Sequence, residues 1–323
     1  MSSIKLPSLL LLAAAATHAA WAQPYPSKPV RVVTQFAAGA SGDVLTRVLT
    51  THLQESMGQP MVVDNRPGAG GVVAAEMVAR SAPDGYTLLV AGPGTQVIRV
   101  FLVRKSSFDP VKDFTPVIAL ADSPVVVVAR NGLPVGSFKE LLDYAKANPD
   151  KVSYGTSGIG SQHHLGGEQI KLLTGARMVH VPYKAGAQAL VDLAAGQLDT
   201  SFSVIGPAMN VIRAGKARPL VAISDKRIPQ VPDVPAITEI IPGYSPFRTW
   251  VGLFGPAGMP DPVLRRINSE SLKAIQTPAG RAKLNDTGYD VIGGSPEDFT
   301  ALIARDLDFV GRVVKSANIQ PTE

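Results

Sequence analysis

Short β-branched or apolar runs alternate along this chain with stretches whose apolar residues recur at helical spacing. The first unit starts with residues 30–34, VRVVT, which is typical of a buried strand. A glycine-rich break at residues 38–42 follows, and a helical pattern then covers residues 44–57. One apolar stripe runs along that helix, formed by Val44, Leu45, Val48, Leu49, Leu53 and Met57. The pattern therefore predicts a strand, a glycine-rich loop and a helix in succession.

The same strand–loop–helix rhythm continues along the chain. Further strands are expected at residues 60–64, 86–91, 125–128, 152–154, 178–181, 198–203, 220–224, 249–254 and 290–292. Further helices are expected at residues 72–80, 138–147, 163–173, 187–195, 208–214, 261–276, 278–285 and 296–315. Strands that alternate with helices indicate an α/β fold made of doubly wound sheets.

Two strands are interpreted as crossings between domains. The run at 125–128 leads into a second βα series, and the strand at 249–254 leads back after a proline-rich passage. The expected division is therefore residues 23–121 plus 250–323 for domain 1, and 122–249 for domain 2. The length of 323 residues suits two domains.

The N-terminus has the pattern of a secretory signal peptide over residues 1–22. Lys5 supplies a positive charge, residues 9–16 are continuously apolar, and Ala20-Trp21-Ala22 is a small-x-small cleavage site. The apolar run is too short to span a membrane. The sequence thus predicts an exported, soluble mature chain that starts at Gln23.

Composition excludes several classes of site. The chain has no cysteine, which removes disulfides, thiolate metal sites and cysteine nucleophiles. The formal net charge is +5, one unit of which leaves with Lys5, and the basic residues are scattered. Nucleic-acid binding is therefore not expected, whereas an anionic ligand is mildly favoured.

The loop from residue 36 to 43 is the first candidate site. The first N–H groups of a helix have no partner inside the helix, and the helix dipole favours negative charge there. Ser41 can cap the helix or donate its hydroxyl to a ligand. Asp43 can accept N–H bonds from the loop or meet a ligand ammonium. An ordinary tight turn explains the same glycines about as well. The candidates in this loop are Phe36, Ala37, Gly39, Ala40, Ser41 and Asp43.

A second loop, from residue 155 to 163, repeats this chemistry with two serines and a helix start. Its candidates are Ser157, Gly160, Ser161, Gln162 and His163. If the two loops face each other across a cleft, both offer donors to a carboxylate. Ser203, at the end of a strand, is included as a further candidate. Lys184 is the nearest charged candidate, because it follows a strand that ends on the same edge.

No motif predicts catalysis, a metal or a cofactor. In the second loop, His163 replaces the third glycine of a dinucleotide fingerprint, and Ser161 replaces the lysine of a phosphate-binding loop. The glycine after Ser157 comes one position too early for a nucleophile elbow. His163 and His164 are adjacent, and adjacent residues point to different faces of a helix. A secreted α/β hydrolase that uses Ser157 or Ser161 with a nearby histidine remains the alternative from another class.

A series of short motifs carries a family resemblance. They are Tyr25-Pro26-Ser27-Lys28-Pro29, Phe36-Ala37-Ala38-Gly39 with Asp43, Asn65-Arg66-Pro67-Gly68-Ala69-Gly70-Gly71, Ala82-Pro83-Asp84-Gly85-Tyr86-Thr87-Leu88, Asp109-Pro110-Val111-Lys112-Asp113-Phe114, His180-Val181-Pro182-Tyr183-Lys184, Pro232-Asp233-Val234-Pro235, Trp250 and Pro256-Ala257-Gly258. Together they resemble the Bug proteins, the periplasmic substrate-binding components of tripartite tricarboxylate transporters. The resemblance covers essentially the whole mature chain.

The resemblance implies a type II periplasmic-binding-protein fold with two βα domains joined by a hinge. It implies a small organic acid held by backbone and hydroxyl donors of the loops that match Phe36–Asp43 and Ser157–His163. It also implies membrane subunits of a tripartite tricarboxylate transporter as partners and the periplasm of a Gram-negative bacterium as location. The mature chain is expected to be a monomer. Ala37-Ala38 departs from the family, in which two prolines are common there. The binding component of an ATP-driven importer would share the fold and is the second alternative.

Overall fold

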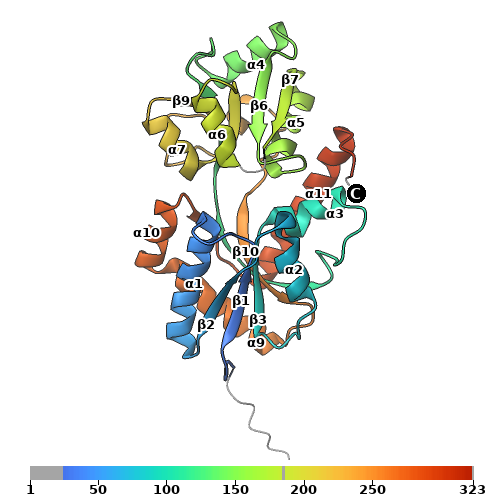
Figure 1. Cartoon of the computed structure of the whole chain (residues 1–323), viewed down its shortest axis with the longest axis vertical. Helices are drawn as coiled ribbons and strands as arrows, with labels where there is room; N and C mark the ends of the chain where they lie inside the picture. Colours follow the sequence, from blue (N-terminus) through green and yellow to red (C-terminus); the bar gives the residue numbers. More distant parts are fainter. Residues whose placement is uncertain (1–24, 184–185, 322–323) are drawn as a thin grey trace, which may run out of the picture.

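The computed structural model describes residues 25–183 and 186–321. Its strands form two separate sheets, which lie in the lower and upper lobes of Figure 1. The six-stranded sheet has the order β11-β4-β10-β3-β1-β2, and the five-stranded sheet has the order β7-β6-β8-β5-β9. The α/β fold with two βα lobes is thus confirmed.

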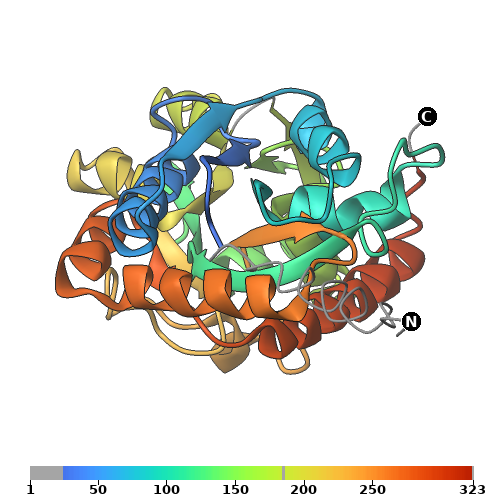
Figure 2. The same ribbon diagram turned by 90° about the horizontal axis from the view of Figure 1, so that it is seen from below.

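The first lobe is built from both ends of the chain. Its strands are β1 (Val30–Thr34), β2 (Met61–Asn65), β3 (Thr87–Ala91), β4 (Phe114–Asp122), β10 (Trp250–Pro256) and β11 (Asp290–Val291). Its helices are α1 (Ser41–Met57), η1 (Ala69–Gly71), α2 (Val72–Ala79), η2 (Gly94–Ile98), α3 (Arg99–Leu102), α9 (Asp261–Gln276), α10 (Pro278–Asp286) and α11 (Pro296–Ser316). Figure 2 shows α9 and α11 following one another along one side of this lobe, where both contact β4.

The second lobe is one continuous part of the chain. Its strands are β5 (Val125–Arg130), β6 (Val152–Thr156), β7 (Met178–Pro182), β8 (Thr200–Val204) and β9 (Ala217–Ile223). Its helices are α4 (Phe138–Ala147), α5 (Gln162–Thr174), α6 (Gly186–Ala194), α7 (Ile205–Arg213) and α8 (Ile237–Ile240).

Strand direction sets where the loops of each lobe lie. β1 pairs in parallel with β2 and β3, and β6 pairs in parallel with β7 and β8. The carboxyl ends of parallel strands meet at one edge of a sheet. The strands next to the crossings are antiparallel to their neighbours: β10 runs against β3 and β4, and β5 runs against β8 and β9. Both sheets are therefore mixed.

Two segments carry the chain between the lobes. The first joins β4 to β5 through Ser123 and Pro124, and the second enters β10 through Thr249. The Thr249 N–H donates to Oδ1 of Asp122 over 2.8 Å, and the Thr249 hydroxyl donates to the Ser123 carbonyl. The two crossing segments are thus hydrogen-bonded side by side.

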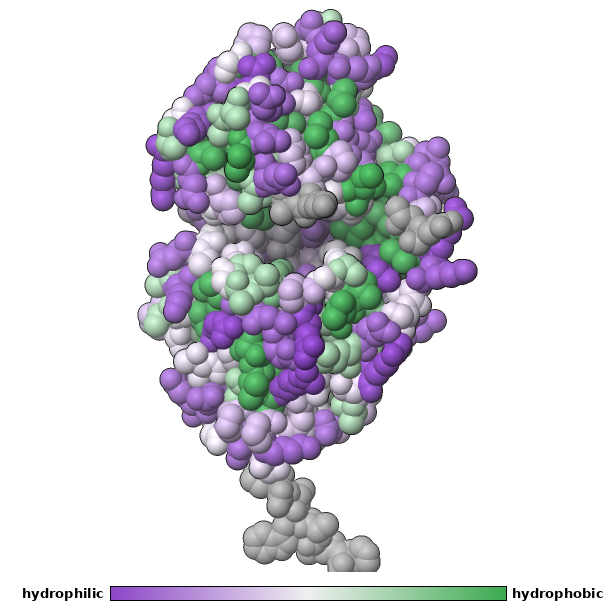
Figure 3. All heavy atoms as spheres, viewed as in Figure 1, coloured by the Kyte–Doolittle hydropathy of each residue, from purple (hydrophilic) through white to green (hydrophobic). Residues whose placement is uncertain are grey.

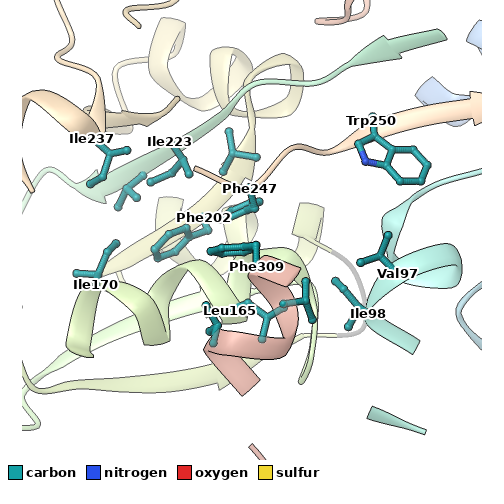
Figure 4. Close-up of a cluster of buried hydrophobic side chains, with 14 of the residues drawn as sticks. Val97, Ile98, Leu165, Ile170, Phe202, Ile223, Ile237, Phe247, Trp250 and Phe309 are labelled. Carbon is teal, nitrogen blue, oxygen red and sulfur yellow. The ribbon is translucent and has the colours of Figure 1, made fainter. Parts of the chain in front are cut away.

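Buried apolar side chains continue from one lobe into the other. Figure 4 shows Val97 and Trp250 of the first lobe in the same cluster as Leu165 and Phe202 of the second. Phe309 of α11 lies among them, and α11 also contacts α5. The C-terminal helix therefore packs against both lobes beside the crossings.

Three parts of the fold were not expected from the sequence. β4 contains Pro116, and a proline inside an apolar run argues against a strand. The π-helical turn η2, which continues into α3, begins at the second glycine of a Gly-Pro-Gly sequence, and such a sequence usually marks a loop. The short α8 lies in the proline-rich passage that showed no periodicity. Among the described residues, no helix has the length and apolar character needed to span a bilayer.

Candidate functional site

A cavity of about 270 Å³ lies at the waist between the lobes, where Figure 3 shows the surface hollowed. The first lobe and the crossing segments contribute Gln35, Phe36, Ser41, Gly92, Pro93, Gly94, Ser123, Thr249, Trp250, Val251 and Tyr289. The second lobe contributes Gln162, His163 and Val204. Neither lobe alone forms this cavity.

The first loop places the start of α1 at the cavity. Ala40, not Ser41, is the N-cap, with φ −68° and ψ 157°, and it has no side chain that can cap. Ser41 is the first helical residue, and its Oγ lies 3.4 Å from the hydroxyl of Tyr289. Of the two roles expected for Ser41, capping is therefore wrong. The first-turn N–H groups of α1 receive no side-chain cap.

Asp43 lies beneath this loop. Its side chain is buried, and Oδ2 accepts from the Gly39 N–H at 2.9 Å and from Nε of Arg47 at 3.0 Å. Oδ1 accepts from the amide of Asn65 at 2.8 Å. Burial alone would raise the pKa of Asp43, but the hydrogen bonds from Arg47, Asn65 and Gly39 outweigh it and lower that pKa. Asp43 does not line the cavity. Its hydrogen bonds instead tie the loop at residues 36–43 to Arg47 and Asn65.

The second loop uses most of its own donors internally. Ser161 is the N-cap of α5: its Oγ accepts from the His164 N–H at 3.2 Å and donates to the Gly158 carbonyl at 2.8 Å. The Gly160 N–H donates to Nδ1 of His164 over 3.0 Å. Ser161 and Gly160 were expected to face a ligand. Neither lines the cavity, because these bonds turn their polar groups into the loop.

A stacked pair of histidines, one buried and one partly buried, supports this loop. The rings of His164 and His180 stack with centroids 4.0 Å apart. Thr156 joins the pair through a 2.6 Å hydrogen bond between its Oγ1 and Nε2 of His180. Burial lowers the pKa of His164, and it lowers the pKa of His180 to about 4. Both rings are therefore neutral near pH 7, and Nδ1 of His164 can accept the bond from Gly160.

Gln162 and His163 bring the start of α5 to the cavity wall. Nε2 of Gln162 donates to the Arg248 carbonyl over 3.1 Å. Nδ1 of His163 lies 3.3 Å from Oγ of Ser157. Burial lowers the pKa of His163 to about 4, so this histidine is also neutral at pH 7.

The remaining candidates are placed as follows. Ser203 is buried and off the cavity, although its neighbour Val204 lines it. Ala37 and Gly39 are exposed on the first loop and do not line the cavity. Lys184 lies outside the described residues. Of the predicted residues, the cavity wall contains Phe36, Ser41, Gln162 and His163.

Four helix starts converge on the cavity. The residues at or next to the starts of α1, η2, α5 and α7 line it, and α1, η2 and α7 have no side-chain cap. None of the lining residues within 25–183 and 186–321 is a lysine, arginine, aspartate or glutamate. The partial positive charge of helix N-termini and neutral donors therefore define the electrostatics of the wall. Such a wall suits a small anion.

Several lining residues were missed by the sequence analysis. They are Gln35, Ser123, Val204, Thr249, Trp250, Val251 and Tyr289, together with the loop at 92–94. Gln35 directly follows β1, so its position at a strand end was a usable signal. Tyr289 comes from the C-terminal part of the chain, and only the tertiary fold brings it to Ser41. In the described part of the chain, no group of three or more histidine, aspartate or glutamate side chains could hold a metal ion.

A larger groove of about 410 Å³ lies on the outside of the first lobe, between α1 and α10. Its wall includes the charged side chains of Arg47, Glu55 and Lys283. One lobe alone forms it, so closure of the lobes would not enclose a ligand there. We therefore exclude this groove as the interlobe ligand site.

Comparison with known proteins places this geometry in a family. The model of the tripartite tricarboxylate transporter family receptor matches residues 45–319. A structure from Rhodopseudomonas palustris solved with adipate is 34% identical, with a TM-score of 0.82, over 92% of this chain and 100% of that one. MatC of the same organism, solved with malate, is 33% identical, with a TM-score of 0.76, over 90% and 100%. The periplasmic binding protein BugD is 30% identical, with a TM-score of 0.77, over 92% and 100%.

Proposed function

The chain belongs to the receptor family of tripartite tricarboxylate transporters, and from this premise we propose that it binds a small carboxylate in the cavity between its lobes. The observation that carries the proposal is the convergence of helix starts on a cavity wall without charged side chains. A carboxylate there would accept hydrogen bonds from N–H groups that have no other partner. The adipate and malate bound by the two relatives support this ligand class.

The proposed site consists of the lining residues and the residues that hold them in place. Phe36, Ser41, Gln162 and His163 contact the ligand. Asp43, Gly160 and Ser161 position the loops, because their hydrogen bonds stay within those loops.

Closure of the lobes completes the site in this proposal. Residues 23–121 plus 250–323 form one moving domain, and 122–249 form the other. The hinge lies at the paired segments around Ser123 and Thr249, because they are where the chain passes between the sheets. A stabilising ligand should therefore also make the protein more compact in small-angle scattering.

The proposed setting follows from the family and the N-terminal sequence. The signal peptide expected at residues 1–22 lies outside the described residues, and it would direct the chain to the periplasm. There the loaded receptor would deliver its ligand to the membrane subunits of a tripartite tricarboxylate transporter. The family, BugD included, favours this setting over an ATP-driven importer.

One contact bears on the rival hydrolase function. Ser157 and His163 lie 3.3 Å apart, which resembles a nucleophile and its base. Burial lowers the pKa of His163 to about 4, so the imidazole is a weak base at pH 7. Ser157 also does not line the cavity. We therefore propose a binding protein rather than an enzyme.

A thermal-shift series on the mature chain tests this function. Adipate, malate and succinate are compared with their diamides, which keep the skeleton and lack the charge. A ligand at 100 times its dissociation constant adds about 2.7 kcal/mol of stability, so at least one acid should raise the melting temperature by a few degrees. Equal shifts with acids and diamides, or no shift with any short-chain acid, would contradict the proposal.

A further inference from the structure

The groove on the outside of the first lobe has no part in the proposed function. Figure 1 shows α1 and α10 side by side on this lobe, and the groove lies between them. Six residues of α1 form one wall, and the end of α9 with the start of α10 forms the other. Its volume of about 410 Å³ falls in the range of small-molecule sites, which is about 300–1,000 Å³. Because one lobe alone forms the groove, it stays accessible whether the lobes are open or closed.

The floor of the groove is apolar. Val44 and Val48 lie one turn apart on α1, and both are half-buried and line the groove. The opposite wall contains the small residues Ala274, Ala279 and Gly280. A Cβ on Gly280 would lie 2.5 Å from the carbonyl oxygen of Ala274, so a larger residue does not fit at this turn. These small residues leave space that an apolar group of a ligand can fill.

Three nitrogen atoms of the groove residues have no hydrogen-bond partner among the described residues. They are Nη1 of Arg47, Nε2 of His52 and Nζ of Lys283. Arg47 uses its other two nitrogens, because Nε donates to Asp43 and Nη2 donates to Asn65. Nε2 of His52 is buried, and buried polar atoms in folded proteins nearly always have a partner. All three nitrogens can donate, and a carboxylate offers two acceptor oxygens.

Glu55 limits the charge that a ligand can carry in this groove. It is exposed and lines the same wall as Arg47, eight residues further along α1. Eight residues correspond to about 12 Å along the helix axis. A ligand with one carboxylate can keep that group away from Glu55. In a diacid of similar length, the second carboxylate would lie near Glu55 and be repelled by it.

We propose that this groove is a second binding site, and that it takes a monocarboxylate with an extended apolar body, such as a medium-chain fatty acid. The apolar body covers Val44 and Val48, and the carboxylate accepts hydrogen bonds from the unused donors of Arg47 and Lys283. The site is independent of the proposed function, because the described residues that line the groove and those that line the cavity between the lobes are different. Both sites can therefore be occupied at once.

Isothermal titration of the mature chain with octanoate tests the proposal. The titration is run on the free protein and on protein saturated with the acid that gives the largest thermal shift, and octanoate should bind equally well to both. Suberate, the diacid with the same number of carbons, should bind the saturated protein at least tenfold more weakly. From butanoate to octanoate the affinity should rise two- to fourfold per methylene, since full burial of one methylene corresponds to about fourfold.

Two results would overturn the proposal: octanoate does not bind, or the acid that fills the cavity displaces it. If no short-chain acid binds the protein at all, the proposed function fails, and the octanoate titration on the free protein still decides whether the groove is a site.

Variants then locate the octanoate. Val48→Glu places a carboxylate on the apolar floor and should weaken octanoate binding at least tenfold, and Lys283→Gln removes an unused cation and should weaken it about fivefold. The matched controls are Val191→Glu on α6 and Lys146→Gln on α4, which are exposed on the second lobe and should leave octanoate binding unchanged. All four variants should bind the acid of the cavity like the wild type. Octanoate affinities within threefold of the wild type in both folded groove variants would contradict the assignment. If Val48→Glu fails to fold, Lys283→Gln still decides.

Discussion

Asp43 shows how a charge next to a proposed anion site can support it. A carboxylate in the first turn of α1 would repel an anionic ligand if it faced the cavity. The three donors around it neutralise its charge locally and tie Gly39, Arg47 and Asn65 to the helix start. Gly39 has φ +81°, a conformation that glycine adopts readily, so the loop can turn its N–H back toward Asp43.

Asp43→Ala should lower the free energy of unfolding by about 2–4 kcal/mol, because it leaves buried donors without an acceptor. Asp43→Asn keeps the shape of the side chain and one acceptor oxygen, so it should lower the free energy of unfolding by less. Arg47→Gln is the control, since Arg47 is exposed and its ion pair contributes little. Urea denaturation measures all three. Equal decreases in the free energy of unfolding for Asp43→Ala and Arg47→Gln would show that Asp43 does not organise the loop.

At the scale of elements, local sequence signals predicted the two loops that reach the cavity wall, but they did not predict which hydrogen bonds the polar groups of these loops make. A β-branched run, glycines and an apolar stripe predicted β1 and α1 because those signals act over a few residues. Ser161 could equally have been a cap or a ligand donor, and only the fold shows its hydroxyl bonded to His164 and Gly158. β4 was missed because Pro116 masked a strand whose partners are distant in sequence.

Ser161→Ala and Ser137→Ala form a matched pair at this scale. Ser161→Ala removes the capping hydroxyl of α5, and Ser137→Ala removes that of α4. Each change should lower the free energy of unfolding by about 1 kcal/mol. Only Ser161→Ala should also weaken ligand binding, because the start of α5 lines the cavity. Denaturation and titration on both variants measure this. Unchanged affinity in Ser161→Ala would show that the cap does not position the site.

At the scale of the whole molecule, the site depends on contacts that no local pattern could predict. Tyr289 and Trp250 reach the cavity from the C-terminal part of the chain, and His163 reaches it from the second lobe. The domain boundaries at residues 121/122 and 249/250 stay a prediction. The position of Lys184 lies outside the described residues, so its part in binding also stays a prediction.

The buried His163 and the partly buried His180 should make stability depend on pH between about 6.5 and 4. Burial lowers the folded-state pKa of His163 and His180 to about 4, whereas unfolded histidine titrates near 6.5. The unfolded chain binds more protons in this window, so stability falls as the pH falls. Asp122 and Asp306 act in the opposite direction, because burial raises their pKa to about 6.

The variant His163→Gln separates these contributions. Its free energy of unfolding should depend less steeply on pH between 4 and 6.5 than that of the wild type, in urea titrations at several pH values. Asp306→Asn is the control of opposite sign: it should make stability rise more steeply with pH between about 4 and 6. Parallel curves for His163→Gln and the wild type would mean that His163 is not held neutral by the fold.

The central claim is that backbone N–H groups at a helix start, rather than a basic side chain, hold a carboxylate in the cavity. Titration of the best-binding acid into Ser41→Pro and Ser41→Ala tests it most directly. Proline is tolerated at the first position of a helix, and Ala40 already has the extended conformation required before proline. Ser41→Pro removes one N–H donor and Ser41→Ala keeps it. We predict a loss of about 10- to 150-fold for Ser41→Pro beyond that of Ser41→Ala, at unchanged melting temperature. Equal affinities of the two variants, with binding abolished by Lys184→Ala, would contradict the account.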